Sequence, residues 1–154
     1  MALVLEKTVG PAAGHPANAA ATHSESKLNI AVVFTSVNAT LAALKRAGAL
    51  AASLRARITL LVPQVVPYPL PLESPPVLLD FTERRFRLIA DQSPVETTVR
   101  IYLCRDGWEM VSAELSAHSL VVVGGRRRWW PTRAERLVRK LSRAGHEVIF
   151  AETE

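Results

Sequence analysis

Residues 29–62, which read NIAVVFTSVNATLAALKRAGALAASLRARITLLV, decide the fold of this chain. The stretch begins with a continuous apolar run rich in β-branched residues, 29–34, which is typical of a strand buried on both faces. An alanine-rich segment with apolar residues at helical spacing follows, and Asn38 is placed to cap this predicted helix. Residues 58–62 predict a second buried strand. Strand, helix and strand in this order indicate a right-handed unit with two parallel strands.

The alternation of strands and helices continues to the end of the chain. Six prolines within residues 63–76 first predict an irregular connection. The elements expected after it are a helix at 76–90, an alternating strand at 96–103, a helix opened by Asp106 and Glu109, a strand at 119–123, a helix opened by Thr132 and Glu135 and ended by Gly145, and a strand at 147–151. The sequence therefore predicts an α/β domain of three layers, α/β/α, around a five-stranded parallel sheet.

The first residues of the chain differ from the rest in composition. Residues 1–27 are rich in Ala, Gly, Pro, Ser and His and show no sustained hydrophobic period. We therefore expect a flexible N-terminal tail at 1–27 and one domain at 28–154, a size that suits a single core. The chain holds no apolar run long enough for a membrane helix, no basic start with a long apolar stretch, and one cysteine. These features predict a cytoplasmic protein.

Basic residues are concentrated in one segment. The formal net charge is +5, and residues 126–143 hold eight arginines and lysines against a single acid, Glu135. The remainder of the chain is therefore slightly acidic, and the basic character is local. Trp129 and Trp130 lie within this segment, where they could stack on bases, rest on a membrane surface, or cover a helix end or a subunit contact. One alternative function is therefore electrostatic attachment to nucleic acid or to an anionic membrane.

Two parts of the sequence resemble the universal stress protein family. The opening unit at 29–62 is similar to the first strand, helix and strand of that family, and SLVVVGG…PTRAERLVRKLSRAGHEVIF, within 119–150, is similar to its close. The likeness covers about residues 28–152 in layout, with the specific motifs at the two ends. It implies an adenine nucleotide alpha hydrolase-like fold, a homodimer with a role in the stress response, and binding of ATP or another adenine nucleotide without catalysis. The apolar last strand, at 148–151, is suited to pair at a dimer edge.

The sequence departs from the ATP-binding members of that family at two places. After the fourth strand, those members carry a loop that consists of G-x-x-G, about nine further residues, and then G-S or G-T. The backbone N–H groups of this loop cradle phosphates. Here Gly124 matches the first glycine and Thr132 keeps the hydroxyl, but Pro131 replaces the glycine before it and the intervening stretch is shorter. Thr35 stands where the ATP-binding members have an aspartate. We therefore expect the affinity for ATP to be weak or absent.

A ligand site is expected at the carboxyl ends of the strands. Open α/β sheets bind ligands where the direction of the connections reverses, and the resemblance implies that this reversal lies between the first and fourth predicted strands. Backbone donors, a helix dipole and arginine side chains there could hold a nucleotide or another small anion. The candidate binding residues are Thr35, Ser36, Val62, Gly124, Gly125, Arg126, Arg127 and Thr132. The alternative is that the glycines make a tight turn and the arginines are solvated.

No catalytic or metal-binding pattern is recognisable. The sequence lacks a Ser–His–Asp set and a pair of carboxylates in catalytic spacing, and none of its four histidines has metal-ligand spacing. Cys104 stands next to Arg105, which could lower the pKa of the thiol, although a buried and unreactive cysteine is the simpler reading. We therefore expect a binding domain and not an enzyme. A member that has lost its nucleotide and acts through protein–protein contacts is a second alternative.

Overall fold

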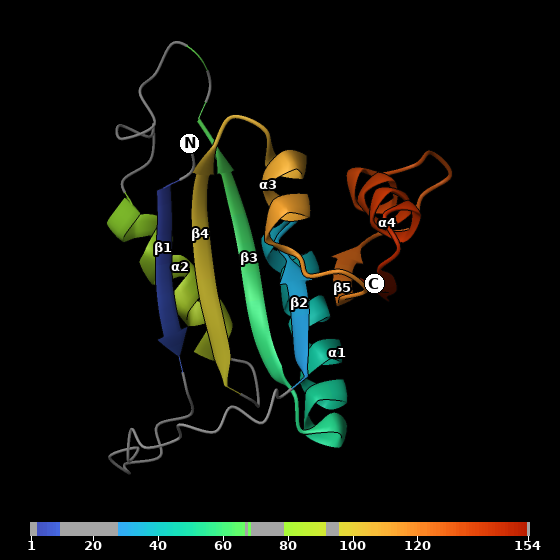
Figure 1. Cartoon of the computed structure of the whole chain (residues 1–154), viewed down its shortest axis with the longest axis horizontal. Helices are drawn as coiled ribbons and strands as arrows, with labels where there is room; N and C mark the ends of the chain where they lie inside the picture. Colours follow the sequence, from blue (N-terminus) through green and yellow to red (C-terminus); the bar gives the residue numbers. More distant parts are fainter. Residues whose placement is uncertain (1–2, 10–27, 67, 69–78, 92–95, 154) are drawn as a thin grey trace.

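A six-stranded sheet with strand order β1-β4-β3-β2-β5-β6 forms the middle layer of the protein (Figure 1). The computed structural model describes residues 3–9, 28–66, 68, 79–91 and 96–153. The strands are β1 (Leu3–Val9), β2 (Asn29–Val33), β3 (Arg57–Val65), β4 (Thr97–Cys104), β5 (Leu120–Gly125) and β6 (Glu147–Glu152). The helices are α1 (Val37–Leu54), α2 (Leu79–Asp91), α3 (Gly107–Glu114) and α4 (Arg133–Arg143).

The five strands from β2 to β6 run parallel, and helices cover both faces of the sheet. Alternate residues of the strands pack on opposite sides, so that Val32 faces one core and Val33 the other. The first core lies under α1 and α2, and the second lies under α3 and α4. In Figure 1 the first pair of helices lies behind the sheet, with α3 on the near side. The predicted three-layer α/β/α fold with a five-stranded parallel sheet is thereby confirmed.

Strand β1 adds a sixth, antiparallel strand that the sequence did not predict. It pairs with β4 from Leu3 opposite Leu103 to Val9 opposite Thr97. These residues fall within the predicted tail at 1–27, which was assigned because its composition shows no sustained hydrophobic period. An edge strand needs only backbone partners along one side, so such a segment can still extend a sheet. The rest of the predicted tail, residues 10–27, lies outside the described residues.

Local capping signals place three of the helices. Thr132 and Glu135 form the predicted capping box at the start of α4, and the Asp106 side chain accepts hydrogen bonds from the first turn of α3. The N-cap of α1 is Ser36. The predicted cap, Asn38, was wrong, because it lies two positions further along the chain. Gly145, with φ of 92°, follows the end of α4 as predicted. The predicted start of the second helix, at 76–78, lies outside the described residues.

Strand β3 continues through Pro63, where the sequence predicted an irregular connection. The backbone N–H and C=O groups of odd-numbered residues in β3 point towards β2, as the hydrogen bond from Phe34 N–H to the Leu61 carbonyl shows. Those of even-numbered residues point towards β4, and the Val66 N–H that donates to the Cys104 carbonyl follows the same alternation. The missing N–H of Pro63 therefore faces the β2 side, and β2 has already ended at Val33. A proline costs no ladder hydrogen bond in that position. As a result, β3 extends beyond β2 and the sheet edge is recessed at β2.

Candidate functional site

A cleft of about 410 Å³ opens over the recessed end of β2, at the carboxyl edge of the sheet. The connection after β2 leads through α1 to β3, and the connection after β5 leads through α4 to β6, so the chain reverses direction between these two strands. This is the position where open α/β sheets bind their ligands. The cleft is lined by Val33, Phe34, Thr35, Pro63, Gly107, Trp108, Val111, Arg133, Arg136, Leu137 and Lys140.

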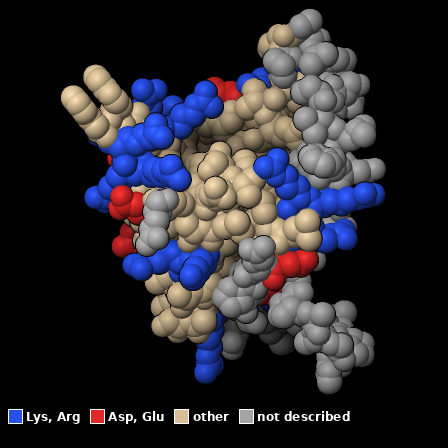
Figure 2. Space-filling view, turned by 180° about the vertical axis from the view of Figure 1, so that it is seen from behind, with Lys and Arg blue, Asp and Glu red and all other residues tan. Residues whose placement is uncertain are grey.

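One wall of the cleft is cationic. Arg133, Arg136 and Lys140 lie at i, i+3 and i+7 on α4, a spacing that puts them on one face of the helix. No aspartate or glutamate is among the lining residues, all of which the structure describes. Figure 2 views the opposite face of the sheet, which α1 and α2 cover, so it shows Lys and Arg side chains of that face and not the wall of the cleft. This wall presents three positive charges to the cleft, and an anion that enters the cleft would be attracted to them.

The facing wall is formed by α3 and presents an aromatic ring. Trp108 is half-buried, and its backbone N–H is held by the Asp106 carboxylate at 2.9 Å, at the start of the helix. The Lys140 ammonium lies 5.4 Å from the centre of the Trp108 ring, within the range of a cation–π contact. The cleft thus combines the Trp108 ring with three positive charges.

Thr35 forms part of the floor and joins the two strands at the reversal point. Its hydroxyl donates to the Gly124 carbonyl at 2.9 Å, and its backbone N–H donates to the Thr40 hydroxyl at 3.3 Å. An aspartate at this position could not donate to a carbonyl when ionised. Thr35 therefore holds the end of β2 against β5 while it lines the cleft.

The two glycines at the end of β5 serve helix packing. A Cβ on Gly124 would overlap the Ala39 carbonyl of α1, and a Cβ on Gly125 would lie 2.6 Å from the Ala134 Cβ of α4. Both glycines are buried, and neither lines the cleft. They let α1 and α4 approach the sheet closely from its two faces, which is the tight-packing role that glycine supplies without a ligand.

The start of α4 is closed by its own side chains. The Glu135 carboxylate accepts the Thr132 N–H at 2.8 Å, and the Thr132 hydroxyl accepts the Glu135 N–H at 3.2 Å. The negative charge of Glu135 also sits at the positive end of the helix dipole. An anion at this helix start would have to displace Glu135, so Thr132 is better explained as a cap than as a ligand residue.

The remaining predicted site residues do not line the cleft. Ser36 caps α1, and Val62 is buried in the core. Arg126 is exposed, and Arg127 turns towards β6, with its Nε 4.0 Å from Glu152 and its guanidinium 5.7 Å from the centre of the Phe150 ring. Of the eight predicted residues, Thr35 alone lines the cleft.

The cations of α4 were not singled out from the sequence. The signal was present, because Arg133, Arg136 and Lys140 share one helix face next to Leu137. From the sequence, these residues belonged to the basic segment 126–143, an alternative attachment surface for nucleic acid or an anionic membrane, and they were not placed at the predicted ligand site. The position of α3 determines which charged face of α4 meets a neighbouring helix. That position is set by the tertiary fold, so the sequence of α4 alone does not reveal it.

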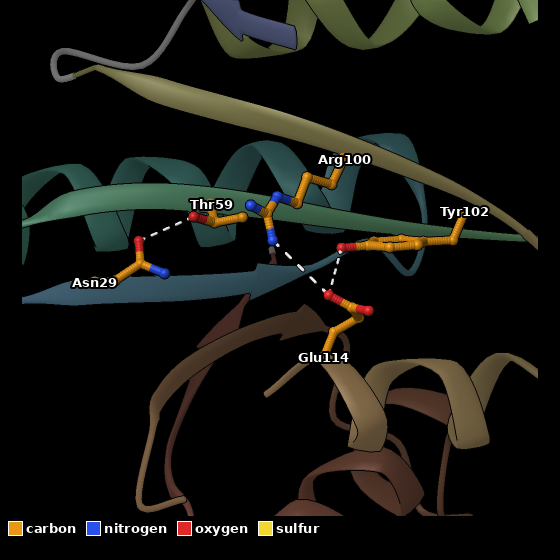
Figure 3. A network of polar contacts seen from close by, with 5 residues as sticks. All are labelled: Asn29, Thr59, Arg100, Tyr102 and Glu114. Atoms are coloured by element: carbon orange, nitrogen blue, oxygen red, sulfur yellow. Dashed lines mark hydrogen bonds and ion pairs between the residues drawn. The ribbon is translucent and has the colours of Figure 1, made fainter. Parts of the chain in front are cut away.

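A second polar cluster lies on the same face, nearer the amino ends of the strands (Figure 3). Arg100 and Tyr102 point from β4 towards Glu114 of α3, whose carboxylate accepts the Tyr102 hydroxyl at 3.0 Å and lies 3.8 Å from the Arg100 guanidinium. Burial is the main reason that the pKa of Tyr102 is raised to about 12. Next to it, the Thr59 hydroxyl donates to the Asn29 side chain at 2.9 Å. The cluster ties the C-terminal end of α3 to β4 and so helps to fix one wall of the cleft.

Cys104 has the surroundings of an unreactive thiol. Burial, and secondly the Asp106 carboxylate, raise the pKa of the Cys104 thiol. Arg105 does not activate it, because its guanidinium donates to the Val66 carbonyl at 2.8 Å and stacks on Tyr68. Within the described ranges, no group of three His, Cys, Asp or Glu side chains is arranged to hold a metal ion.

The comparisons with known proteins add no relative. No known protein-family model matches the chain, and no curated protein is significantly similar to it in sequence. In the part of the chain that the structure describes, no helix has the length and apolar character needed to cross a bilayer. The function must therefore be argued from the cleft itself.

Proposed function

We propose that this protein is a non-catalytic, universal-stress-protein-like binding domain that holds a small anionic ligand in the cleft at the end of β2. The observation that carries the proposal is the set of three cations, Arg133, Arg136 and Lys140, facing Trp108 in a cleft with no acidic lining. Guanidinium groups recognise phosphates and carboxylates through paired hydrogen bonds. The place of the cleft at the reversal point supports the same conclusion.

The ligand class that fits best is an adenine mononucleotide. The cleft volume of about 410 Å³ lies within the range of about 300–1,000 Å³ that small-molecule sites occupy. A phosphate would lie against Arg133 and Arg136, and the planar base would lie against Trp108. A triphosphate with Mg²⁺ is a poorer fit, because Thr35 replaces the acid and Pro131 replaces the glycine of the ATP-binding pattern. No carboxylate or histidine lines the cleft to act as an acid or base, which supports binding without catalysis.

The direct test is calorimetric titration of the full chain with AMP, alongside mass spectrometry of any ligand released from the purified protein. Arg133→Ala with Arg136→Ala should weaken AMP binding by about tenfold or more, since each lost charged hydrogen bond is worth about 1.5–3 kcal/mol. Arg139→Ala with Arg143→Ala is the matched control, because it removes the same charge from the same helix outside the cleft. This control should change the affinity by less than about twofold.

Three outcomes would contradict the proposal. Absence of AMP binding, with no nucleotide or other anion released from the folded protein, would favour a domain that acts through protein–protein contacts. Equal losses in both arginine pairs, with a steep dependence on salt, would show diffuse attraction of polyanions. Turnover of the nucleotide during titration would show an enzyme.

We also propose that the protein forms a homodimer through β6. This strand is an edge of the sheet, and Val148, Ile149 and Phe150 are half-buried. Pairing between two copies of an exposed apolar edge would cover these residues. Light scattering should give twice the chain mass, and Ile149→Lys should shift the protein to the monomer. A wild-type monomer at high concentration would refute the proposal.

A further inference from the structure

The loop between β5 and α4 presents two tryptophans to solvent. Trp129 is 84% exposed and Trp130 is 74% exposed, and their rings stack in parallel with 5.6 Å between the centroids and 1° between the planes. Large apolar side chains with this exposure are costly in water and mark a surface for a partner. The cleft does not account for them, because neither tryptophan lines it.

Positive charge surrounds the two rings. Arg126 and Arg128 are exposed, and neither has an ion pair with any residue that the structure describes. Arg127 leans on Phe150 of β6 and so stays at the base of the loop. Residues 126–131 contain no acid. The loop thus joins an apolar tip to a cationic base.

A second aromatic and cationic pair lies at the same end of the sheet. Tyr68 is 80% exposed, and the Arg105 guanidinium lies 4.1 Å from the centre of its ring. Tyr68 follows β3 and Arg105 follows β4, while the tryptophan loop follows β5. Because these strands are parallel, all three connections leave from the carboxyl edge. Exposed rings and cations therefore recur along one edge of the molecule.

We propose that this carboxyl edge binds an anionic lipid surface, with Trp129 and Trp130 inserted at the headgroup level. Tryptophan rings favour the membrane–water interface, where the apolar ring is buried and the indole N–H stays hydrated. Arg126 and Arg128 then lie against the anionic headgroups. Two signals of modest strength, one apolar and one electrostatic, together give reversible attachment.

The geometry favours lipid over single-stranded nucleic acid. A base held between two rings needs a gap of about twice the stacking distance of roughly 3.4 Å, whereas the two tryptophan centroids are 5.6 Å apart. Proteins that bind single strands line a groove with their aromatic residues, so that the backbone runs along it. Here the rings project from the surface, as their exposure shows. A projecting apolar tip is suited to enter a soft interface.

The test is sedimentation of the full chain with vesicles of phosphatidylcholine containing roughly 30 mol % phosphatidylserine. Binding is expected to these vesicles and to be at least about tenfold weaker to phosphatidylcholine alone. Trp129→Ala with Trp130→Ala should weaken binding by about tenfold or more. The control is Leu54→Ala with Leu88→Ala, which removes two exposed apolar side chains elsewhere and should change binding by less than about twofold.

The electrostatic contribution to vesicle binding is tested by a second double variant with its own matched control. Arg126→Ala with Arg128→Ala should weaken binding by about tenfold or more, whereas Lys45→Ala with Arg46→Ala, on α1, should have little effect. In a Trp108→Phe background, the remaining tryptophan emission should shift to the blue when anionic vesicles are added.

Each of the following results would overturn the proposal. One such result is that the chain fails to sediment with anionic vesicles, and another is that the tryptophan double variant and its control variant lose binding equally. The emission does not shift, which would leave the rings in water. A single-stranded oligothymidylate binds more tightly than the vesicles and depends on the same tryptophans, which would make nucleic acid the partner.

Discussion

The substitution Gly124→Ala tests whether the glycines after β5 exist for packing. Gly124 is buried beneath the first turn of α1, and an added Cβ would overlap the Ala39 carbonyl oxygen and lie 2.5 Å from its carbon. Both of these atoms belong to the backbone, so no side-chain rotation can relieve the overlap. The helix must move away from the sheet, or the strand must bend.

The size of the effect follows from this geometry. Ordinary contact between carbon atoms begins at about 3.5 Å, so α1 would have to retreat by roughly 1 Å at its start. Ala39 and Ala43 are buried there and would lose contact with the sheet. Overpacking usually costs about 1–3 kcal/mol, and a clash with backbone belongs at the upper limit of that range or beyond it. For a domain of this size a loss of about 3 kcal/mol lowers the Tm by about 10 °C.

Gly107→Ala is the matched control, measured by urea and thermal unfolding followed by circular dichroism. A Cβ on Gly107 would lie 3.5 Å from the Pro63 Cβ and 3.7 Å from Val65, which are ordinary contacts. Alanine at the first position of α3 should leave the stability unchanged or raise it by up to about 1 kcal/mol. If Gly124→Ala unfolds at the same temperature as the wild type, the packing explanation is wrong. A normally stable variant that lost only ligand binding would show a ligand role instead.

Three further predictions concern stability. Thr132→Ala should cost about 1 kcal/mol in urea unfolding, because it removes the cap of α4, and no change would show that Glu135 alone suffices. The raised pKa of Tyr102, about 12 against about 10 unfolded, gives stability that is present below pH 10 and lost as the pH rises towards 12. The substitution Tyr102→Phe should abolish that loss of stability. If the variant loses stability between pH 10 and 12 as the wild type does, the prediction is wrong. Deletion of residues 1–9 should lower the Tm and promote aggregation by baring the edge of β4, and an unaffected monomer would show that β1 contributes nothing.

The succession of parallel strands and helices along the chain could be predicted because its signals are local. Residues 29–62 contain two buried strands and a helix whose periodicity is unambiguous, and the Thr132–Glu135 box marks a helix start within four residues. Strand β1 could not be predicted in this way, since it exists only through its pairing with β4, about 90 residues away in sequence. The passage of β3 through Pro63 depends in the same way on where the neighbouring strand ends.

The cleft lies where the sequence placed a ligand site, but only Thr35 of the eight candidate residues lines it. The resemblance placed the reversal point between the first and fourth predicted strands, which correspond to β2 and β5, and the cleft lies there. The pair Gly124 and Gly125 has the composition of a phosphate loop, yet composition does not distinguish a glycine that approaches a ligand from one that approaches a helix. That difference depends on the space around each glycine, which only the packed structure defines. A Cβ added to Gly125 would lie 2.6 Å from the Ala134 Cβ, and one added to Gly124 would overlap the Ala39 carbonyl of α1.

The recessed end of β2 is a property of main-chain lengths. Since β2 stops at Val33 while β3 continues to Val65 and β5 to Gly125, the hollow between them does not depend on any single side chain being small. Substitutions on α3 and α4 can therefore change the charge and polarity of the walls while the hollow itself persists. Point mutations on these walls could therefore change which molecules the cleft accepts, without passing through an unfolded intermediate or one that lacks the hollow.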